Sequence, residues 1–255
     1  MDVLARVAQI TIGDEYYDNV TPVERVYVSL RKAILDCKFN PIIAEIKSAS
    51  PSAGVIRENV EADAVARVME KAGAVGLSVL TEPKQFNGSL EALAKARRAV
   101  KIPILMKDII LSPIQIQAAS KLGANAVLLI QTLFDRGYCQ KTIDEMINGA
   151  HMMGLEVLLE THTLSEFASA LKTDADLIGI NNRNLGTLTV DLNVTKTILQ
   201  SINPKNKLIV SESGINTPSD ISFLHESGAS AFLIGSSIMS CENIGEKVKE
   251  FVNAR

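Results

Sequence analysis

The chain has 255 residues, of which 47% are hydrophobic and 22% charged, so it can bury a full core and has the usual length of one α/β barrel. Its formal net charge is -3 and its lysines and arginines are scattered, so neither nucleic acid nor a membrane surface is an expected partner. The sequence contains no signal-peptide pattern and no apolar run of about 18 residues, so we expect neither secretion nor membrane insertion.

Cysteine usage indicates a reducing compartment. Cys37, Cys139 and Cys241 are odd in number, far apart and not in a Cys-x-x-Cys arrangement. This pattern argues against disulfides or a zinc site and favours reduced thiols that pack in the protein. We therefore expect a cytoplasmic protein.

Residues 1–40 are more polar than the rest of the chain, and we interpret them as an N-terminal helical extension. Within them Thr21 offers an N-cap, Pro22 suits the first helical position and Glu24 completes a capping box. A helix is therefore predicted to begin at this point.

From residue 41 onward, short aliphatic or β-branched runs alternate with helical patterns. Eight of these runs predict strands, at 42–47, 75–80, 104–107, 126–130, 156–160, 177–181, 208–211 and 231–234. Helix starts are indicated by Ser112-Pro113, by Thr163 with Glu166, and by Thr217-Pro218, and helix ends by Gly73, Gly123 and Gly228.

Eight βα units predict a parallel sheet that closes into a (β/α)8 TIM barrel. We place this barrel at residues 41–255, after the extension, and expect the whole chain to form a single domain. A doubly wound open sheet is the alternative fold, although no Gly-x-Gly-x-x-Gly motif follows the first strand.

Ionisable side chains cluster where the predicted strands end. Glu45 and Lys47 are two residues apart in the first strand, so they are predicted to stand side by side on one face. Other strands end in Lys107-Asp108, Glu160, Asn181 with Arg183, Ser211 to Gly214, and Ile234 to Ser237. Because barrel chemistry occurs at the C-terminal strand ends, this convergence favours an active site over scattered structural ion pairs.

Two subsites are predicted at these strand ends. Gly214 and Gly235-Ser236 follow the last two strands, where barrels commonly bind phosphate, and the hydroxyls of Ser50 and Ser52 could add donors. Either glycine loop taken alone could be an ordinary turn. The Lys/Glu cluster is suited to general acid and base work on an anionic substrate. No metal or cofactor is expected, since no His-rich or Asp-rich ligand set occurs among the strand ends.

Two residues beside this cluster have more than one interpretation. His162 follows Glu160 by two and could face the site, where an orienting or structural role is favoured over proton transfer. Phe86, in the loop after the second strand, could pack the loop or stack on a planar substrate ring.

Several stretches together resemble the indole-3-glycerol phosphate synthase family, in the family's order and from about residue 41 to 240. They are Ile43 to Lys47 with Ala49 to Ser52, Leu80 to Pro83 with Phe86-Asn87-Gly88, Leu105 to Asp108, Leu158 to Glu160, Ile178 to Leu185, Val210 to Ile215, and Phe232 to Ser237.

The resemblance implies a carboxy-lyase that converts 1-(2-carboxyphenylamino)-1-deoxyribulose 5-phosphate to indole-3-glycerol phosphate, carbon dioxide and water. It implies that Lys107 is the general acid, that Glu160 handles protons beside Glu45, and that Lys47 holds the substrate carboxylate. The other implied contacts are Asn181, Arg183 and Glu212 as orienting groups, Ser50, Ser213, Gly214, Gly235 and Ser236 at the phosphate, and Phe86 at the anthranilate ring. It further implies a small-molecule substrate and a monomer or at most a weak homo-oligomer.

Three positions depart from the family pattern. Ile109 stands where phenylalanine is common, and Ser48 and Ala53 stand where basic residues are common. These changes alter the aromatic slot and reduce positive charge near the phosphate, without touching the proposed acid or base.

Three other functions remain open from the residues alone. Another phosphosugar barrel enzyme, such as phosphoribosylanthranilate isomerase, would be expected to use a Cys/Asp pair, whereas the first strand here ends in Glu45 and Lys47. A Schiff-base aldolase would use Lys107 as a nucleophile. A non-catalytic scaffold would have little reason to keep Lys107, Glu160 and Asn181 together.

Overall fold

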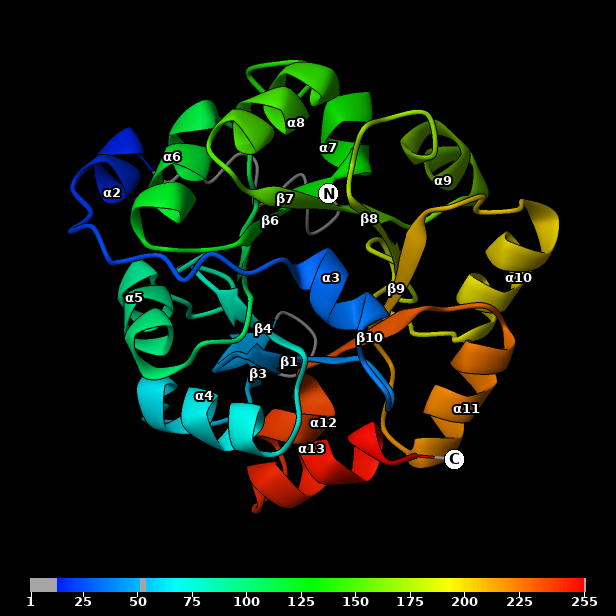
Figure 1. The fold of residues 1–255 in the computed structure, drawn as a ribbon. Helices are drawn as coiled ribbons and strands as arrows, with labels where there is room; N and C mark the ends of the chain where they lie inside the picture. The colour runs from blue at the N-terminus through cyan, green and yellow to red at the C-terminus, as the bar shows by residue number, and fades with distance from the viewer. Residues whose placement is uncertain (1–12, 51–53, 255) are drawn as a thin grey trace.

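The computed structural model describes residues 13–50 and 54–254, and its centre is a closed barrel of eight parallel strands (Figure 1). The strands are β1 (Ile42–Ile46), β4 (Gly76–Leu80), β5 (Ile104–Lys107), β6 (Ala126–Ile130), β7 (Glu156–Thr161), β8 (Leu177–Asn181), β9 (Leu208–Glu212) and β10 (Ala231–Ile234). Each pairs with the next barrel strand, and β10 pairs with β1 to close the ring. The predicted (β/α)8 barrel is confirmed, and the open-sheet alternative is wrong.

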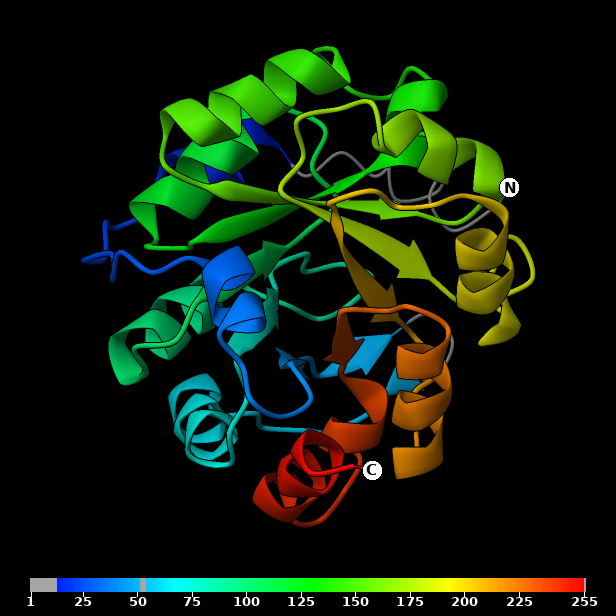
Figure 2. The same cartoon turned by 45° about the vertical axis from the view of Figure 1, so that its right-hand side comes forward.

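Helices cover the outside of the barrel in a ring (Figures 1 and 2). They are α4 (Ala62–Lys71), α5 (Leu90–Ala99), α6 (Pro113–Lys121), α7 (Gln131–Asp135), α8 (Ile143–Met152), α9 (Leu164–Ala170), α10 (Asn193–Ser201), α11 (Pro218–Glu226), α12 (Ser236–Met239) and α13 (Ile244–Val252). The predicted caps Ser112, Thr163 and Thr217 accept from backbone N–H groups of their helices. Among the described residues, no helix is long and apolar enough to cross a membrane.

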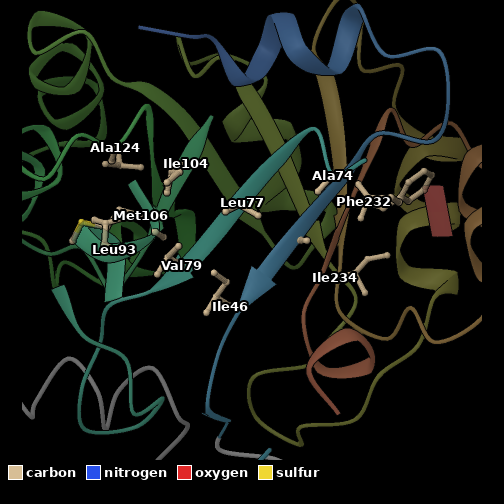
Figure 3. Close-up of a cluster of buried hydrophobic side chains, with 14 of the residues drawn as sticks. Ile46, Ala74, Leu77, Val79, Leu93, Ile104, Met106, Ala124, Phe232 and Ile234 are labelled. Atoms are coloured by element: carbon tan, nitrogen blue, oxygen red, sulfur yellow. The ribbon is translucent and has the colours of Figure 1, made fainter. Parts of the chain in front are cut away.

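Side-chain alternation divides the core into two parts. Residues on the outer strand face, such as Leu77, Val79 and Ile104, pack against the helices (Figure 3). Residues on the inner face, such as Ile43 and Leu105, fill the barrel interior. Because successive strand residues alternate faces, Ile43, Glu45 and Lys47 share the inner face, and the barrel is apolar at its base and ionisable at its C-terminal end.

The helix predicted to begin at Pro22 is not formed, and tertiary contacts hold residues 20–29 outside any helix or strand. The Val23 N–H donates to the carbonyl of Lys121, and the Asn125 side chain donates to the carbonyl of Val26. The helix α3 (Leu30–Leu35) begins later, and its Ser29 cap accepts from the backbone N–H of Lys32. Local capping signals were therefore overridden by contacts with the barrel.

Helix α3 closes the N-terminal end of the barrel, opposite the ionisable end. Leu30 is fully buried and packs with the interior residues, and the Glu156 carboxylate at the start of β7 accepts from the backbone N–H of Leu30 at 2.7 Å. Figures 1 and 2 both show α3 lying over the strands, inside the ring of helices. This part of the N-terminal segment therefore does not cover the catalytic end.

Helix α2 (Asp14–Asp18) lies beside the other end of the barrel. The Tyr16 hydroxyl donates to the carbonyl of Thr81 at 3.0 Å, and the Tyr17 hydroxyl donates to the Asp108 carboxylate at 3.1 Å. Thr81 and Asp108 directly follow β4 and β5, so these hydrogen bonds attach α2 to the C-terminal ends of the two strands. The domain boundary at residue 40 stays a prediction.

Candidate active site

The C-terminal strand ends surround one pocket of about 280 Å³, which suits a small molecule. Every predicted site residue that the structure describes lines this pocket. These residues are Glu45, Lys47, Ser50, Phe86, Lys107, Glu160, Asn181, Arg183, Glu212, Ser213, Gly214, Gly235 and Ser236. Ser52 lies outside the described residues, as does Ala53. The parallel barrel therefore gathers side chains that are up to 191 positions apart in sequence, from Glu45 to Ser236.

The first ionic group of the pocket is the pair at the end of β1. Lys47 Nζ lies 3.0 Å from Glu45 Oε1, and both side chains are largely buried. The hydroxyl of Ser78, on the neighbouring strand β4, donates to Glu45 Oε2 at 3.2 Å. The predicted side-by-side placement is confirmed, and Ser78 is a supporting contact that the sequence did not reveal.

The second ionic group is centred on Lys107, at the end of β5. Its ammonium donates to Glu160 Oε2 at 3.0 Å and to Glu212 Oε2 at 3.2 Å. Burial acts to lower the pKa of Lys107, yet the carboxylates of Glu160 and Glu212 outweigh it and raise that pKa above its usual value. The lysine is therefore held as an ammonium.

The two carboxyl groups beside Lys107 have opposite proton affinities. Burial acts to raise the pKa of Glu160, but Lys107 and His162 together hold it well below its usual value. Burial raises the pKa of Glu212 to about 8; Lys107 opposes this rise and the charge of Glu160 adds to it. Glu160 is therefore the ionised member at neutral pH, whereas Glu212 retains a proton over much of that range.

Asn181 and Arg183 complete this side of the pocket. The Asn181 amide donates to Glu160 Oε1 at 3.0 Å, while its own oxygen accepts from the backbone N–H of Arg183. The Arg183 guanidinium donates to the carbonyl of Leu188, which ties the loop after β8 to the pocket wall. These contacts fix the donors and acceptors before a substrate arrives.

The loops after β9 and β10 contain the residues that were predicted to bind an anion. Ser213 and Gly214 have φ values of 67° and 86°, a left-handed pair that turns the chain at the pocket rim. A side chain at Gly214 would overlap Val190, so glycine is required there on two counts. On the neighbouring loop, Gly235 precedes α12 and places Ser236 at the start of that short helix.

The apolar wall of the pocket includes Phe86, Leu128 and Ile109. The position of Phe86 depends on Glu82, whose buried carboxylate accepts from the backbone N–H groups of Lys84, Gln85 and Phe86. The aromatic ring therefore reaches the pocket from a loop that is fixed by its own hydrogen bonds.

Gly179 is a residue whose importance the sequence did not reveal. It lies on the inner face of β8, and a Cβ there would overlap Glu212 Oε1 and crowd the Glu160 backbone. An inward-facing glycine in the middle of a strand is the signal that could have identified it.

Replacing Gly179 with alanine should displace the Glu212 carboxylate from Lys107. Overpacking of this kind costs roughly 1–3 kcal/mol of stability. We expect a lower Tm together with a loss of turnover, measured by thermal unfolding and by initial rates. Gly149→Ala, at a helix position where a Cβ meets nothing within 4 Å, is the matched control. Equal effects in the two variants would contradict the packing argument.

The closed barrel and its pocket of paired lysines and carboxylates define a (β/α)8-barrel enzyme of the acid–base type. The family model described as "Indole-3-glycerol phosphate synthase" matches residues 3–251. The chain therefore belongs to the indole-3-glycerol phosphate synthase family.

Individual relatives agree with this assignment. The chain is 49% identical to the indole-3-glycerol phosphate synthase of Methanocaldococcus jannaschii, over 88% of this chain and 82% of the relative. It is 39% identical to the enzyme of the same name from Aquifex aeolicus, over 96% of this chain and 95% of the relative.

Solved structures of other proteins share only the fold. A thiamine phosphate pyrophosphorylase from Pyrococcus furiosus superposes with a TM-score of 0.61 at 16% identity, covering 88% of this chain and 96% of that one. An N-acetylmannosamine-6-phosphate 2-epimerase from Clostridium perfringens superposes with a TM-score of 0.62 at 13% sequence identity, covering 84% of this chain and 93% of that one.

Proposed function

We propose that this protein converts 1-(2-carboxyphenylamino)-1-deoxyribulose 5-phosphate to indole-3-glycerol phosphate, carbon dioxide and water. The observation that carries the proposal is the buried ion pair of Lys107 with Glu160, at the C-terminal end of a family barrel. Ring closure requires an acid at the carbonyl oxygen, and the attacking ring carbon then loses its carboxyl group as carbon dioxide. The dehydration that follows requires a base for the proton released, and the pair supplies both the acid and the base.

Lys107 is the proposed general acid. Its raised pKa keeps the side chain protonated, so the ammonium can stabilise charge on the substrate carbonyl oxygen and donate a proton as the ring carbon attacks. Glu160 is the proposed proton-handling carboxylate in the condensation and dehydration steps, and its lowered pKa means that it is ionised before the reaction begins. Asn181 orients Glu160 through its amide hydrogen bond.

The remaining roles follow from charge and position. Lys47, paired with Glu45, is the proposed contact for the substrate carboxylate. Glu212 and Arg183 are proposed to orient the sugar hydroxyls. Ser50, Ser213, Gly214, Gly235 and Ser236 are proposed to hold the phosphate, and Phe86 to receive the anthranilate ring.

The electrostatics of Lys107 argue against the aldolase alternative. A Schiff-base lysine must lose its proton to attack a carbonyl, and such lysines are activated by a lowered pKa. The carboxylates around Lys107 instead raise its pKa. Borohydride with the substrate should therefore fail to trap a covalent adduct on this lysine.

A monomeric, cytoplasmic enzyme is part of the same proposal. The thiols of Cys37, Cys139 and Cys241 are all unpaired, which is typical of a reducing compartment.

The proposed function is tested by following the indole ring of the product, by absorbance or fluorescence, in buffer containing EDTA. We expect turnover that is unchanged by the chelator, because the acid and the base are both side chains of the protein. A folded protein that binds the substrate without turnover would point to the departures at Ser48, Ala53 and Ile109. A folded protein that does neither would overturn the proposal.

A further inference from the structure

His162 occupies a position next to the catalytic carboxylate that the mechanism above does not use. Its Nε2 atom lies 3.1 Å from Glu160 Oε1, on the other oxygen from the one that accepts from Lys107. The distance between these two atoms is that of an ion pair, but the geometry does not meet the criteria for a hydrogen bond. Only 8% of the His162 side chain is exposed, and both ring nitrogens are buried.

A second carboxylate holds the far side of the ring. Glu166, in the first turn of α9, places its Oε2 atom 3.5 Å from His162 Nδ1. The same oxygen accepts from the backbone N–H of His162 at 2.7 Å, and Oε1 accepts from the Thr132 hydroxyl at 2.9 Å. Two hydrogen bonds thus fix the Glu166 carboxylate beside Nδ1 of the imidazole.

We propose that His162, held by Glu166, is a positioning residue that fixes the Glu160 carboxylate from the side away from Lys107. It does not line the main pocket, so it acts through Glu160 and not on the substrate. The inference rests on the proposed role of Glu160 and deepens it, because the base is then held by cations at both of its oxygens.

The charge state of the ring agrees with this geometry. Burial acts to lower the pKa of His162, but Glu160 and Glu166 outweigh it and raise the pKa to about 9. His162 also lines a small second cavity, whose other charged residues are Glu166, Arg136, Arg183 and Asp191. The imidazolium is therefore present throughout the neutral range and is lost as the pH rises through about 9.

The kinetic test compares His162→Gln and Glu166→Gln with the wild type from pH 6 to 10. In the wild type, kcat should fall as His162 loses its proton near pH 9. His162→Gln should lower kcat about tenfold at neutral pH, as expected for the loss of one charged neighbour of a carboxylate. The pH profile of this variant should also lack the decrease in kcat near pH 9. KM should change less than about twofold, since the substrate contacts stay in place. In Glu166→Gln the decrease in kcat should occur at lower pH, because Glu166 raises the pKa of His162.

His151→Gln is the matched control. This histidine lies on α8 at the surface, where Nε2 faces the Asp176 carboxylate at 2.9 Å, and it lines neither the main pocket nor the cavity beside His162. The control should keep the wild-type profile. The positioning role would be overturned if His162→Gln lost the same fraction of kcat at every pH and still showed the decrease in kcat near pH 9.

A nuclear magnetic resonance titration of the histidine rings tests the same inference without substrate. In the wild type, His162 should titrate near pH 9, and in Glu166→Gln and Glu160→Gln it should titrate lower. A His162 that titrates near its ordinary value of 6.5 would overturn the inference. If the wild type lacks turnover but shows the raised titration, the proposed function fails while the Glu166, His162 and Glu160 arrangement stands.

Discussion

Replacing Lys107 with methionine should lower kcat by roughly 100- to 10,000-fold, the range that general acid catalysis supplies. The change removes the ammonium that donates to Glu160 and to Glu212 while keeping a chain of similar length. The carbonyl oxygen of the substrate then has neither a proton donor nor a positive charge at this position. Initial rates of product fluorescence measure the loss.

The same variant should be more stable at pH 5 than at pH 8. Without the ammonium, Glu212 loses the charge that opposes its raised pKa and Glu160 loses the main charge that lowers its pKa, so both pKa values increase and that of Glu212 lies well above the 4.5 of an unperturbed glutamate. The native state then binds more protons than the unfolded chain, and stability falls as the pH increases above about 4.5. Cooperative thermal unfolding at both pH values would show that the fold is retained.

Two further variants separate charge from proton transfer at Lys107. Arginine keeps the positive charge but does not deprotonate, so Lys107→Arg should remain inactive if proton donation is required. Lys95→Met, which only breaks a surface ion pair with Glu91, should keep normal activity. Near-normal turnover in Lys107→Met would mean that the acid is a different residue.

The fold and most pocket residues could be predicted because both follow from local periodicity. A strand buried in a parallel barrel requires a continuous apolar run, and its end is marked where polar residues begin. Once eight such runs were aligned in parallel, their ends had to meet on one face. Glu45, Lys107 and Glu160 could therefore be assigned to one pocket without any coordinates.

The pairing within the pocket could not be predicted in the same way. Lys107 pairs with Glu160 and Glu212, while Lys47 pairs with Glu45, and this choice depends on the stagger of strands around the closed barrel. The helix expected at Pro22 failed for a related reason. Its capping signals are local, whereas contacts with the rest of the barrel hold that segment in a non-helical conformation.

The opposite pKa shifts of Glu160 and Glu212 come from their different neighbours. Both carboxyl groups are buried and both accept from Lys107. Glu160 also has His162 and the Asn181 amide, whereas Glu212 Oε1 has no hydrogen-bond partner among the described residues. Neighbours that stabilise negative charge on one member therefore leave the shared proton on the other.

Replacing Glu160 with glutamine should abolish most turnover while leaving the shape of the pocket nearly unchanged. Glutamine has the same size, and its oxygen can still accept from Lys107, but it cannot take the proton that is lost in the dehydration step. A loss of roughly 100- to 10,000-fold in kcat is expected, with KM within a few-fold of the wild type, because the phosphate and carboxylate contacts are made by other residues.

The control for this variant is Glu91→Gln, which removes an exposed carboxylate from α5 and should leave kcat unchanged. A Glu160→Gln protein that unfolds cooperatively, binds the substrate and fails to turn it over would identify Glu160 as the base. If the variant instead keeps near-normal kcat, the base must be sought in Glu212, the other buried carboxyl group that accepts from Lys107. The pH profile of Glu160→Gln distinguishes the two. Loss of the Glu160 charge lowers the pKa of Glu212 from its wild-type value of about 8, so residual activity that depends on Glu212 should rise with pH through a midpoint below about 8.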